Sequence, residues 1–141
     1  MSSKIWQIYL KAAKLKNCLV TISNYPSPVT AAFSYVEEKI PDVKLNGDRV
    51  NRLPGNANFS FKYVDGEELL LDLDAKGIAA SSGSACSSGT DAPSHVLLAI
   101  GLTAETAKGA LRITMGEENT KEDIDYLVST LTEIVRKIRK N

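Results

Sequence analysis

The sequence predicts an α+β fold, a two-layer sandwich in which a small, mostly antiparallel sheet has helices packed on one face. Three observations support this prediction. Residues 56–61 and 110–116 alternate apolar and polar side chains, as half-buried strands do. Helical patterns lie between and after these strands, and the longest of them is near the C-terminus. The chain has 141 residues, which is enough for one domain with its own core.

The first forty residues carry weaker signals. Apolar spacing allows a helix over 5–15, residues 18–22 resemble a strand, and the Pro-containing stretch 24–28 is predicted to be a loop. A second helix over 33–40 would end at Pro41, because the residue before a proline is pushed out of the helical region.

The strand at 56–61 separates two kinds of side chain. Ala57, Phe59 and Phe61 fall on one face, which we predict to cover the core. Asn58 and Ser60 fall on the opposite, polar face.

Several short elements are predicted in the middle of the chain. Residues 65–77 have acids at their start and end on Gly77, so they indicate a short buried helix. Residues 78–81 are then predicted to be a strand. A helix is expected over 92–101, which begins with proline and ends with glycine, and a further helical piece over 103–108.

The strand that follows places its side chains in the same alternating way. Leu111, Ile113 and Met115 fall on the predicted core face. Arg112 and Thr114 fall on the other face, so the Arg112 guanidinium is expected to point away from the core.

The C-terminal helix is predicted over about 121–139, with Thr120 as its N-cap. Acidic residues fill its first turn and basic residues its last, which matches the helix dipole. Its apolar stripe consists of Ile124, Leu127, Val128, Leu131, Ile134, Val135 and Ile138.

Composition narrows the function classes. Lys plus Arg and Asp plus Glu both number 17, so the formal charge is zero and no charged block suggests a nucleic acid or a membrane as partner. We expect a cytoplasmic location, because the sequence shows no apolar run of membrane-spanning length and no signal-peptide pattern. Two cysteines and one histidine are too few for a disulfide framework or a metal site with soft ligands, so no metal is predicted.

Cys86 lies in a stretch, residues 81–89, that consists only of Ser, Gly, Ala and this cysteine. Small residues leave a thiol accessible, whereas a structural cysteine usually has large apolar neighbours. The thiolate is the reactive form, and no charged residue within this stretch lowers the thiol pKa. The residues alone therefore leave a reactive thiol and an inert one both open.

Four other side chains have a functional and a plainer interpretation. Arg112 can hold a carboxylate through two hydrogen bonds, or simply face solvent. Asn58 can bind a ligand or water. His95 can act as a base, although its place in the first turn of a helix favours a structural role. Cys18 borders an apolar run and is expected to be a core thiol.

Taken together, these segments resemble the C-terminal domain of a cysteine desulfurase of the NifS/IscS type. The resemblance runs from about Val36 to Lys140, so we expect residues 1–35 to be a divergent N-terminal segment and residues 36–141 the desulfurase C-terminal domain. The segments that match in order are residues 40–48, 52–61, 64–86, 81–89, 92–102, 110–116 and 120–128.

The resemblance implies a function for the candidate residues. Such enzymes use pyridoxal phosphate (PLP) to bind L-cysteine, and the cysteine of a mobile loop takes the substrate sulfur as a persulfide, which leaves L-alanine. Cys86 matches that nucleophile, Arg112 matches the arginine that holds the substrate carboxylate, and Asn58 matches an asparagine with a supporting role. The sulfur then serves iron–sulfur cluster assembly or thiolation pathways.

The resemblance also implies partners that this chain does not supply itself. The PLP lysine belongs to a large domain to which nothing in residues 1–35 is similar, so we expect this chain to lack that lysine and to be inactive alone. The implied partners are L-cysteine, a second copy of the chain or a complementing large domain, and an iron–sulfur scaffold or another sulfur-acceptor protein. Two alternatives remain open: a non-catalytic persulfide carrier or interaction module without PLP, and a structural remnant.

Overall fold

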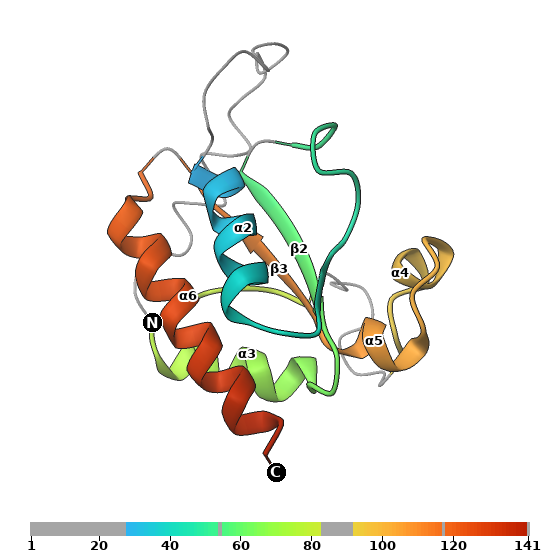
Figure 1. Ribbon diagram of the computed structural model, residues 1–141. Helices are drawn as coiled ribbons and strands as arrows, with labels where there is room; N and C mark the ends of the chain where they lie inside the picture. The colour runs from blue at the N-terminus through green and yellow to red at the C-terminus, as the bar shows by residue number, and fades with distance from the viewer. Residues whose placement is uncertain (1–27, 54, 83–91, 117, 141) are drawn as a thin grey trace.

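The computed structural model describes residues 28–53, 55–82, 92–116 and 118–140. The predicted elements at 5–15 and 18–22, together with Cys18, lie outside these residues. The described elements are α2 (Pro28–Lys39), β1 (Val43–Leu45), β2 (Asn56–Phe61), α3 (Gly66–Ala75), α4 (His95–Ala99), α5 (Ala104–Lys108), β3 (Ala110–Thr114) and α6 (Lys121–Ile138) (Figure 1).

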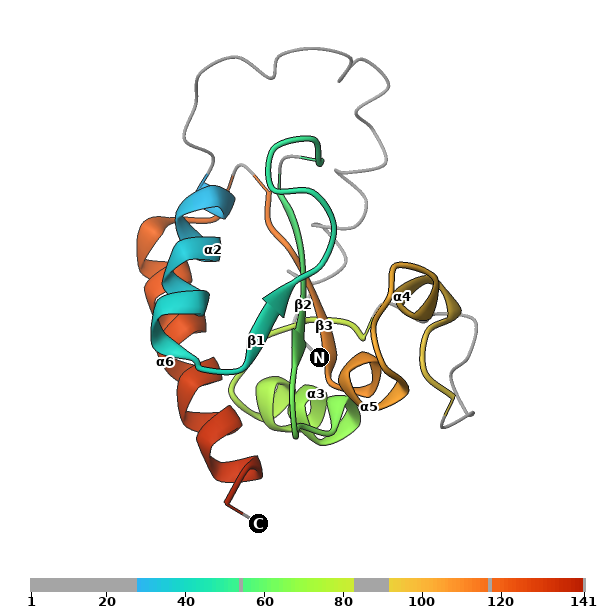
Figure 2. The ribbon, with the colours of Figure 1, turned by 45° about the vertical axis from the view of Figure 1, so that its right-hand side comes forward.

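The sheet is antiparallel throughout, in the order β1-β2-β3. Phe59 in the central strand β2 is paired with Leu45 of β1 and with Leu111 of β3. Figure 2 shows α2 and α6 side by side along one side of the sheet, and α4 and α5 on the other side. This arrangement confirms the predicted α+β sandwich.

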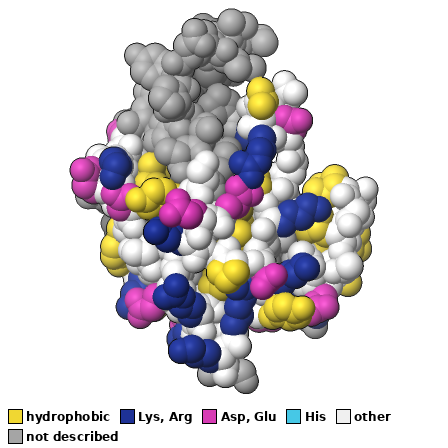
Figure 3. All heavy atoms as spheres, viewed as in Figure 1, with side chains coloured by type: hydrophobic (Ala, Val, Ile, Leu, Met, Phe, Trp, Pro, Cys, Tyr) yellow, Lys and Arg dark blue, Asp and Glu magenta, His cyan; other side chains and the backbone are white. Residues whose placement is uncertain are grey.

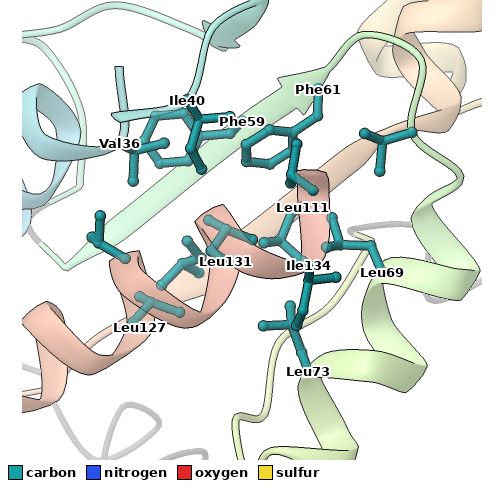
Figure 4. Packing of buried hydrophobic residues seen from close by; sticks show 14 of the residues in the cluster. Val36, Ile40, Phe59, Phe61, Leu69, Leu73, Leu111, Leu127, Leu131 and Ile134 are labelled. Atoms are coloured by element: carbon teal, nitrogen blue, oxygen red, sulfur yellow. The ribbon is translucent and has the colours of Figure 1, made fainter. Parts of the chain in front are cut away.

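The core lies between the sheet and the three longer helices. Phe59, Phe61 and Leu111 point from the strands toward α2, α3 and α6, and all three are fully buried (Figure 4). The helices, and Ile40 just after α2, contribute the side chains that meet them: Val36, Ile40, Leu69, Leu73, Leu127, Leu131 and Ile134. Burying this apolar surface is the main stabilising contribution to the fold, and it leaves the opposite face of the sheet to polar residues.

A smaller apolar cluster holds the α4–α5 unit against that opposite face. Leu97, Leu102 and Ala107 pack with Ala110, the first residue of β3. The outer side of α4 exposes Val96, Leu98 and Ile100, and Figure 3 shows apolar side chains gathered there, at the right of the view.

Most of the predicted elements are confirmed. The last helix runs from Lys121 to Ile138, and its N-terminus is a capping box in which Thr120 and Asp123 bond to each other's backbone N–H groups. The strand at 56–61 has the predicted bounds. The short helix α3 has Asp65 as its N-cap.

The prediction of a strand at 78–81 was wrong. Only Ser81 pairs with the sheet, as an isolated bridge to Arg112. The physical reason is the end of α3, where Gly77 adopts a positive φ of 77° and Ile78 donates its backbone N–H to Leu73. Residue 78 thus closes the helix and does not extend a strand.

Other boundaries also shifted. Helix α4 is shorter than the predicted 92–101, because Ser94 has an extended ψ of 121° and Gly101 ends the segment at φ 88°. The first described helix begins at Pro28, the last residue of the predicted loop, and ends at Lys39, close to the predicted stop at Pro41. Strand β1 was not predicted, since three residues give too short an alternation to recognise.

Candidate functional site

The polar face of the sheet carries a row of four residues, one from each neighbouring segment. Arg112 of β3 is directly opposite Asn58 of β2. Asn46, just after β1, continues this row, since its backbone N–H bonds to the Asn58 carbonyl at 2.8 Å. Ser81 lies on the other flank of Arg112. Side chains directly opposite in an antiparallel pair have neighbouring Cβ atoms, so Asn58 and Arg112 are neighbours on this face.

Asn46 connects the row through its side-chain amide. Its Nδ2 donates to Asn58 Oδ1 at 2.7 Å and to Ser60 Oγ at 2.8 Å. Asn46 is only 5% exposed and Ser60 is fully buried, whereas Asn58 is half-buried. Sequence reasoning missed Asn46, because only the pairing of β1 with β2 brings it beside Asn58.

Arg52 fixes the loop that follows Asn46. Its guanidinium donates to the backbone carbonyls of Asn46, Asp48 and Asn56, at 3.2, 3.1 and 3.2 Å respectively. Partial burial lowers the pKa of this guanidinium, and the charge of Asp48 opposes that shift. The backbone of Asn46 is therefore held from one side of the loop while its amide holds Asn58 on the other.

Asp48 tightens the same loop. Its Oδ1 accepts the backbone N–H groups of Val50 and Asn51, both at 2.7 Å. These bonds, of which the one from Asn51 has the larger effect, hold the pKa of the Asp48 carboxyl below its ordinary value.

Arg112 is anchored by its backbone on two sides. Its N–H donates to the Ser81 carbonyl at 2.5 Å, and its carbonyl accepts the Ser81 N–H at 3.2 Å. Its side chain is half-buried. The chain that leads into the Ser/Gly-rich stretch is therefore fastened beside the candidate carboxylate-binding arginine.

An open hollow of about 420 Å³ lies next to this row, where the sheet meets the α4–α5 unit. Ser60, Lys44 and Lys62 line its sheet side, and Thr103 and Thr106 line its α5 side. Both lysines are exposed, and the exposed Asp42 lines the same hollow, so charges of both signs border it.

The structure brings together two of the three predicted site residues, Arg112 and Asn58. The third, Cys86, lies outside the described residues, as does most of the stretch 81–89. His95, the weaker candidate, is exposed at the start of α4.

Neither a metal centre nor a membrane-spanning helix is found in the described ranges. Within them no group of three or more His, Cys, Asp or Glu side chains is placed to hold a metal ion. No helix in this part of the chain has the length and apolar character needed to cross a membrane.

The row is suited to bind an anion. Arg112 offers a planar fork of N–H donors. Asn58 accepts a bond from Asn46 through its Oδ1, so its Nδ2 remains as a further donor. Donors from two adjacent strands on a half-buried face can hold the two oxygens of a carboxylate.

The small antiparallel sheet and its helices have the fold found in solved NifS-like proteins, and the family comparison agrees with that class. The family described as aminotransferase class-V matches residues 21–127, and the chain belongs to this family.

Within that family, the chain is similar to cysteine desulfurases. It is 55% identical over 107 residues to the cysteine desulfurase IscS of Clostridium botulinum (strain Hall), covering 74% of this chain and 27% of that protein. It is 54% identical over 104 residues to the IscS of Dictyoglomus turgidum, covering 74% of this chain and 26% of that protein. The chain thus spans about a quarter of the length of the curated relatives it matches.

Solved structures agree. The X-ray structure of a NifS-like protein from Rickettsia africae has a TM-score of 0.63 and 28% identity, covering 77% of this chain and 28% of that one. A second structure, described as a NifS-like protein, has a TM-score of 0.64 and 25% identity, covering 78% of this chain and 27% of the other. The resemblance to NifS/IscS-type cysteine desulfurases is thereby confirmed.

Proposed function

We propose that this chain is the C-terminal domain of a cysteine desulfurase, in which Arg112 and Asn58 hold the carboxylate of L-cysteine and Cys86 takes its sulfur. The observation that carries the proposal is the pairing of Arg112 with Asn58 across β2 and β3, with Ser81 bonded to the backbone of Arg112. Similarity to desulfurases over about three-quarters of the chain supports it.

Arg112 is the main binding group in this proposal. A guanidinium carries paired N–H donors that match the two oxygens of a carboxylate. Asn58 adds a neutral donor from the neighbouring strand. Together they orient the substrate by its carboxylate, and the rest of the amino acid is left free to react.

Covalent chain length limits how far Cys86 can lie from Ser81. Cys86 is five positions after Ser81. An extended chain spans at most about 3.3–3.6 Å per residue, so the two Cα atoms are within roughly 18 Å of each other. Because Ser81 is bonded to Arg112, this limit supports the proposal that Cys86 acts on a substrate held by Arg112.

The row of Ser81, Arg112, Asn58 and Asn46 is better suited to a carboxylate than to covalent binding of PLP. The polar face carries donors suited to a carboxylate, and no lysine lies in the row of Ser81, Arg112, Asn58 and Asn46 that the structure describes. We therefore propose that PLP, which supplies an electron sink when it is bound, is held by groups outside this set, on a complementing large domain. The role of this chain is then that the thiolate of Cys86 forms a bond to the substrate sulfur as the carbon–sulfur bond breaks.

The remaining parts of the proposal follow from the same resemblance. The product on this chain is a Cys86 persulfide, to be passed to an iron–sulfur scaffold or another sulfur-acceptor protein, and the other product is L-alanine. We propose that the protein acts in the cytoplasm, as a homodimer or together with a complementing large domain, and that residues 36–141 form the desulfurase domain.

A chimera tests this function. Residues 28–141 of this chain replace the matching segment of the Clostridium botulinum IscS, and sulfide and alanine are measured with L-cysteine and a thiol reductant. The chimera is expected to form both products. Cys86→Ser is expected to abolish sulfide release while PLP binding, measured by visible absorbance, is kept.

Two outcomes would contradict the proposal. Sulfide release that survives Cys86→Ser would remove Cys86 as the sulfur acceptor. An inactive chimera with bound PLP, combined with uptake of sulfur on Cys86 of the separate chain from a persulfide donor by mass spectrometry, would instead indicate a persulfide carrier.

A further inference from the structure

The side-chain amide of Asn46 is buried, and only one of its two polar atoms has hydrogen-bond partners among the described residues. Both acceptors of its Nδ2 lie on β2, at Asn58 Oδ1 and Ser60 Oγ. Its own Oδ1 is buried and has no partner among the described residues. A buried, unsatisfied acceptor destabilises a fold, so its presence requires an explanation.

The explanation lies in the alternative orientation. If the Asn46 amide were turned over, its Oδ1 would face β2 and its two N–H donors would occupy the site where Oδ1 now has no partner. Two buried donors would then be unsatisfied in place of one acceptor. The observed orientation is therefore the better satisfied one, and Asn46 is fixed as a donor toward Asn58.

Because Asn46 donates to Asn58, it determines which atom of the Asn58 amide faces away from Asn46. The Oδ1 of Asn58 is occupied by Asn46, and its Nδ2 has no hydrogen-bond partner within the described residues. Asn58 is opposite Arg112 in the register, so this free Nδ2 lies on the same face as the guanidinium. Turning Asn58 over would place an acceptor there, which would repel a carboxylate.

We propose that Asn46 is a positioning residue that holds Asn58 with its Nδ2 toward the carboxylate site of Arg112. This inference rests on the proposed function for the identity of the ligand, but not for the orientation of the two amides. Arg52 supports the arrangement by holding the Asn46 backbone carbonyl at 3.2 Å.

The orientation can be tested on the full chain without any ligand. In ¹⁵N spectra, both Nδ2 protons of Asn46 are expected to be protected from exchange with water, and those of Asn58 to exchange at least tenfold faster. Asn46→Asp replaces the donor by an acceptor, so the Asn58 Nδ2 is expected to turn inward and become protected. A wild-type spectrum with a protected Asn58 Nδ2 and an unprotected Asn46 Nδ2 would overturn the inference, and this reading needs no variant that might fail to fold.

Ser60→Ala is the matched control. It removes the other acceptor of the same Asn46 amide and keeps the buried volume nearly unchanged, without touching the Asn46–Asn58 bond. It is expected to leave the slow and fast exchange of the two amides as they are. If Ser60→Ala turned Asn58 as Asn46→Asp does, the effect would be general loosening of the sheet, and Asn46 would have no specific role.

Kinetics of the chimera then test the consequence for the substrate. Asn46→Asp is expected to raise KM for L-cysteine about tenfold or more, the cost of losing a donor to a charged group, and to change kcat by less than threefold. Ser60→Ala is expected to change neither by more than threefold. If Asn58 is shown to have turned in Asn46→Asp and KM is still normal, the positioning role is refuted. A chimera with no activity at all would instead refute the proposed function, and the amide exchange result would still stand.

Discussion

Replacing Gly109 by alanine is expected to destabilise the junction on which the site depends. Gly109 precedes β3 and accepts the backbone N–H of Phe61 at 2.9 Å. A Cβ on Gly109 would lie 2.1 Å from the Phe61 carbonyl oxygen and 2.8 Å from that of Val64. The φ of Gly109 is −82°, which alanine adopts without strain, so the effect of this substitution is steric.

The magnitude follows from these contacts. Both obstacles are backbone atoms that cannot turn away, so the strands must separate by about 1 Å, and the bond from Phe61 to Gly109 is lost. Overpacking costs about 1–3 kcal/mol and a lost hydrogen bond about 0.5–1.5 kcal/mol. The free energy of unfolding should therefore fall by about 2–4 kcal/mol.

Urea denaturation followed by circular dichroism measures this difference. With an m-value near 1.5 kcal/mol/M, the midpoint should fall by about 1–3 M. Gly116→Ala is the control, because nothing lies within 4 Å of its Cβ and its φ is not positive. Both substitutions reduce the freedom of the unfolded chain equally. If the two variants unfold within about 0.5 kcal/mol of each other, the steric reasoning is wrong.

Three further predictions follow from contacts elsewhere in the chain. Arg139→Lys should lower the free energy of unfolding, measured in urea, by about 1–2 kcal/mol. The guanidinium bonds to the backbone carbonyls of residues 41, 42 and 62, and a single ammonium cannot reach all three. Arg136→Lys, on the exposed side of the same helix, is the control and should change this free energy by less than about 0.5 kcal/mol. The Asp48 carboxyl should titrate by NMR with a pKa below the usual value of about 3.9. Because the folded pKa is depressed, the carboxylate stabilises the loop above the unfolded pKa, and this stabilisation is lost as the pH falls through the folded pKa. A midpoint at or above about 3.9 would contradict the assignment. Leu131→Ala, at a fully buried position, should cost about 2–5 kcal/mol in the same urea assay, whereas Leu71→Ala, at a side chain 72% exposed, should cost less than about 1 kcal/mol; equal losses would place the core elsewhere.

The elements that could be predicted are those whose patterns are local. Helix α6 shows its apolar stripe and its cap at Thr120 within one continuous segment, and β2 alternates over six residues. The side-chain direction of Arg112 also follows from alternation within its own strand. Three residues of β1 give no such pattern, and the bridge at Ser81 depends on a partner 31 positions away, so neither could be read from the neighbouring sequence.

The site was predictable only in part, for the same reason. Arg112 and Asn58 could each be placed on a polar face, but the register that sets them opposite each other is a property of the folded sheet. Asn46 is a clearer case, since an asparagine after a short apolar segment resembles an ordinary turn residue. Its role becomes visible only when β1 pairs with β2 and its amide meets Asn58 and Ser60.

The two faces of the sheet explain why these polar residues can be held so closely. Helices α2, α3 and α6 bury one face with Phe59, Phe61 and Leu111, and that apolar contact fixes the register of all three strands. A slip of one residue would send the aromatic side chains to the polar face, so the core that stabilises the fold also holds Asn46, Asn58 and Arg112 in one row. A substitution that loosens the core should therefore weaken carboxylate binding in step with its effect on register, whereas one that only turns Asn58 should weaken binding while the three strands keep their register.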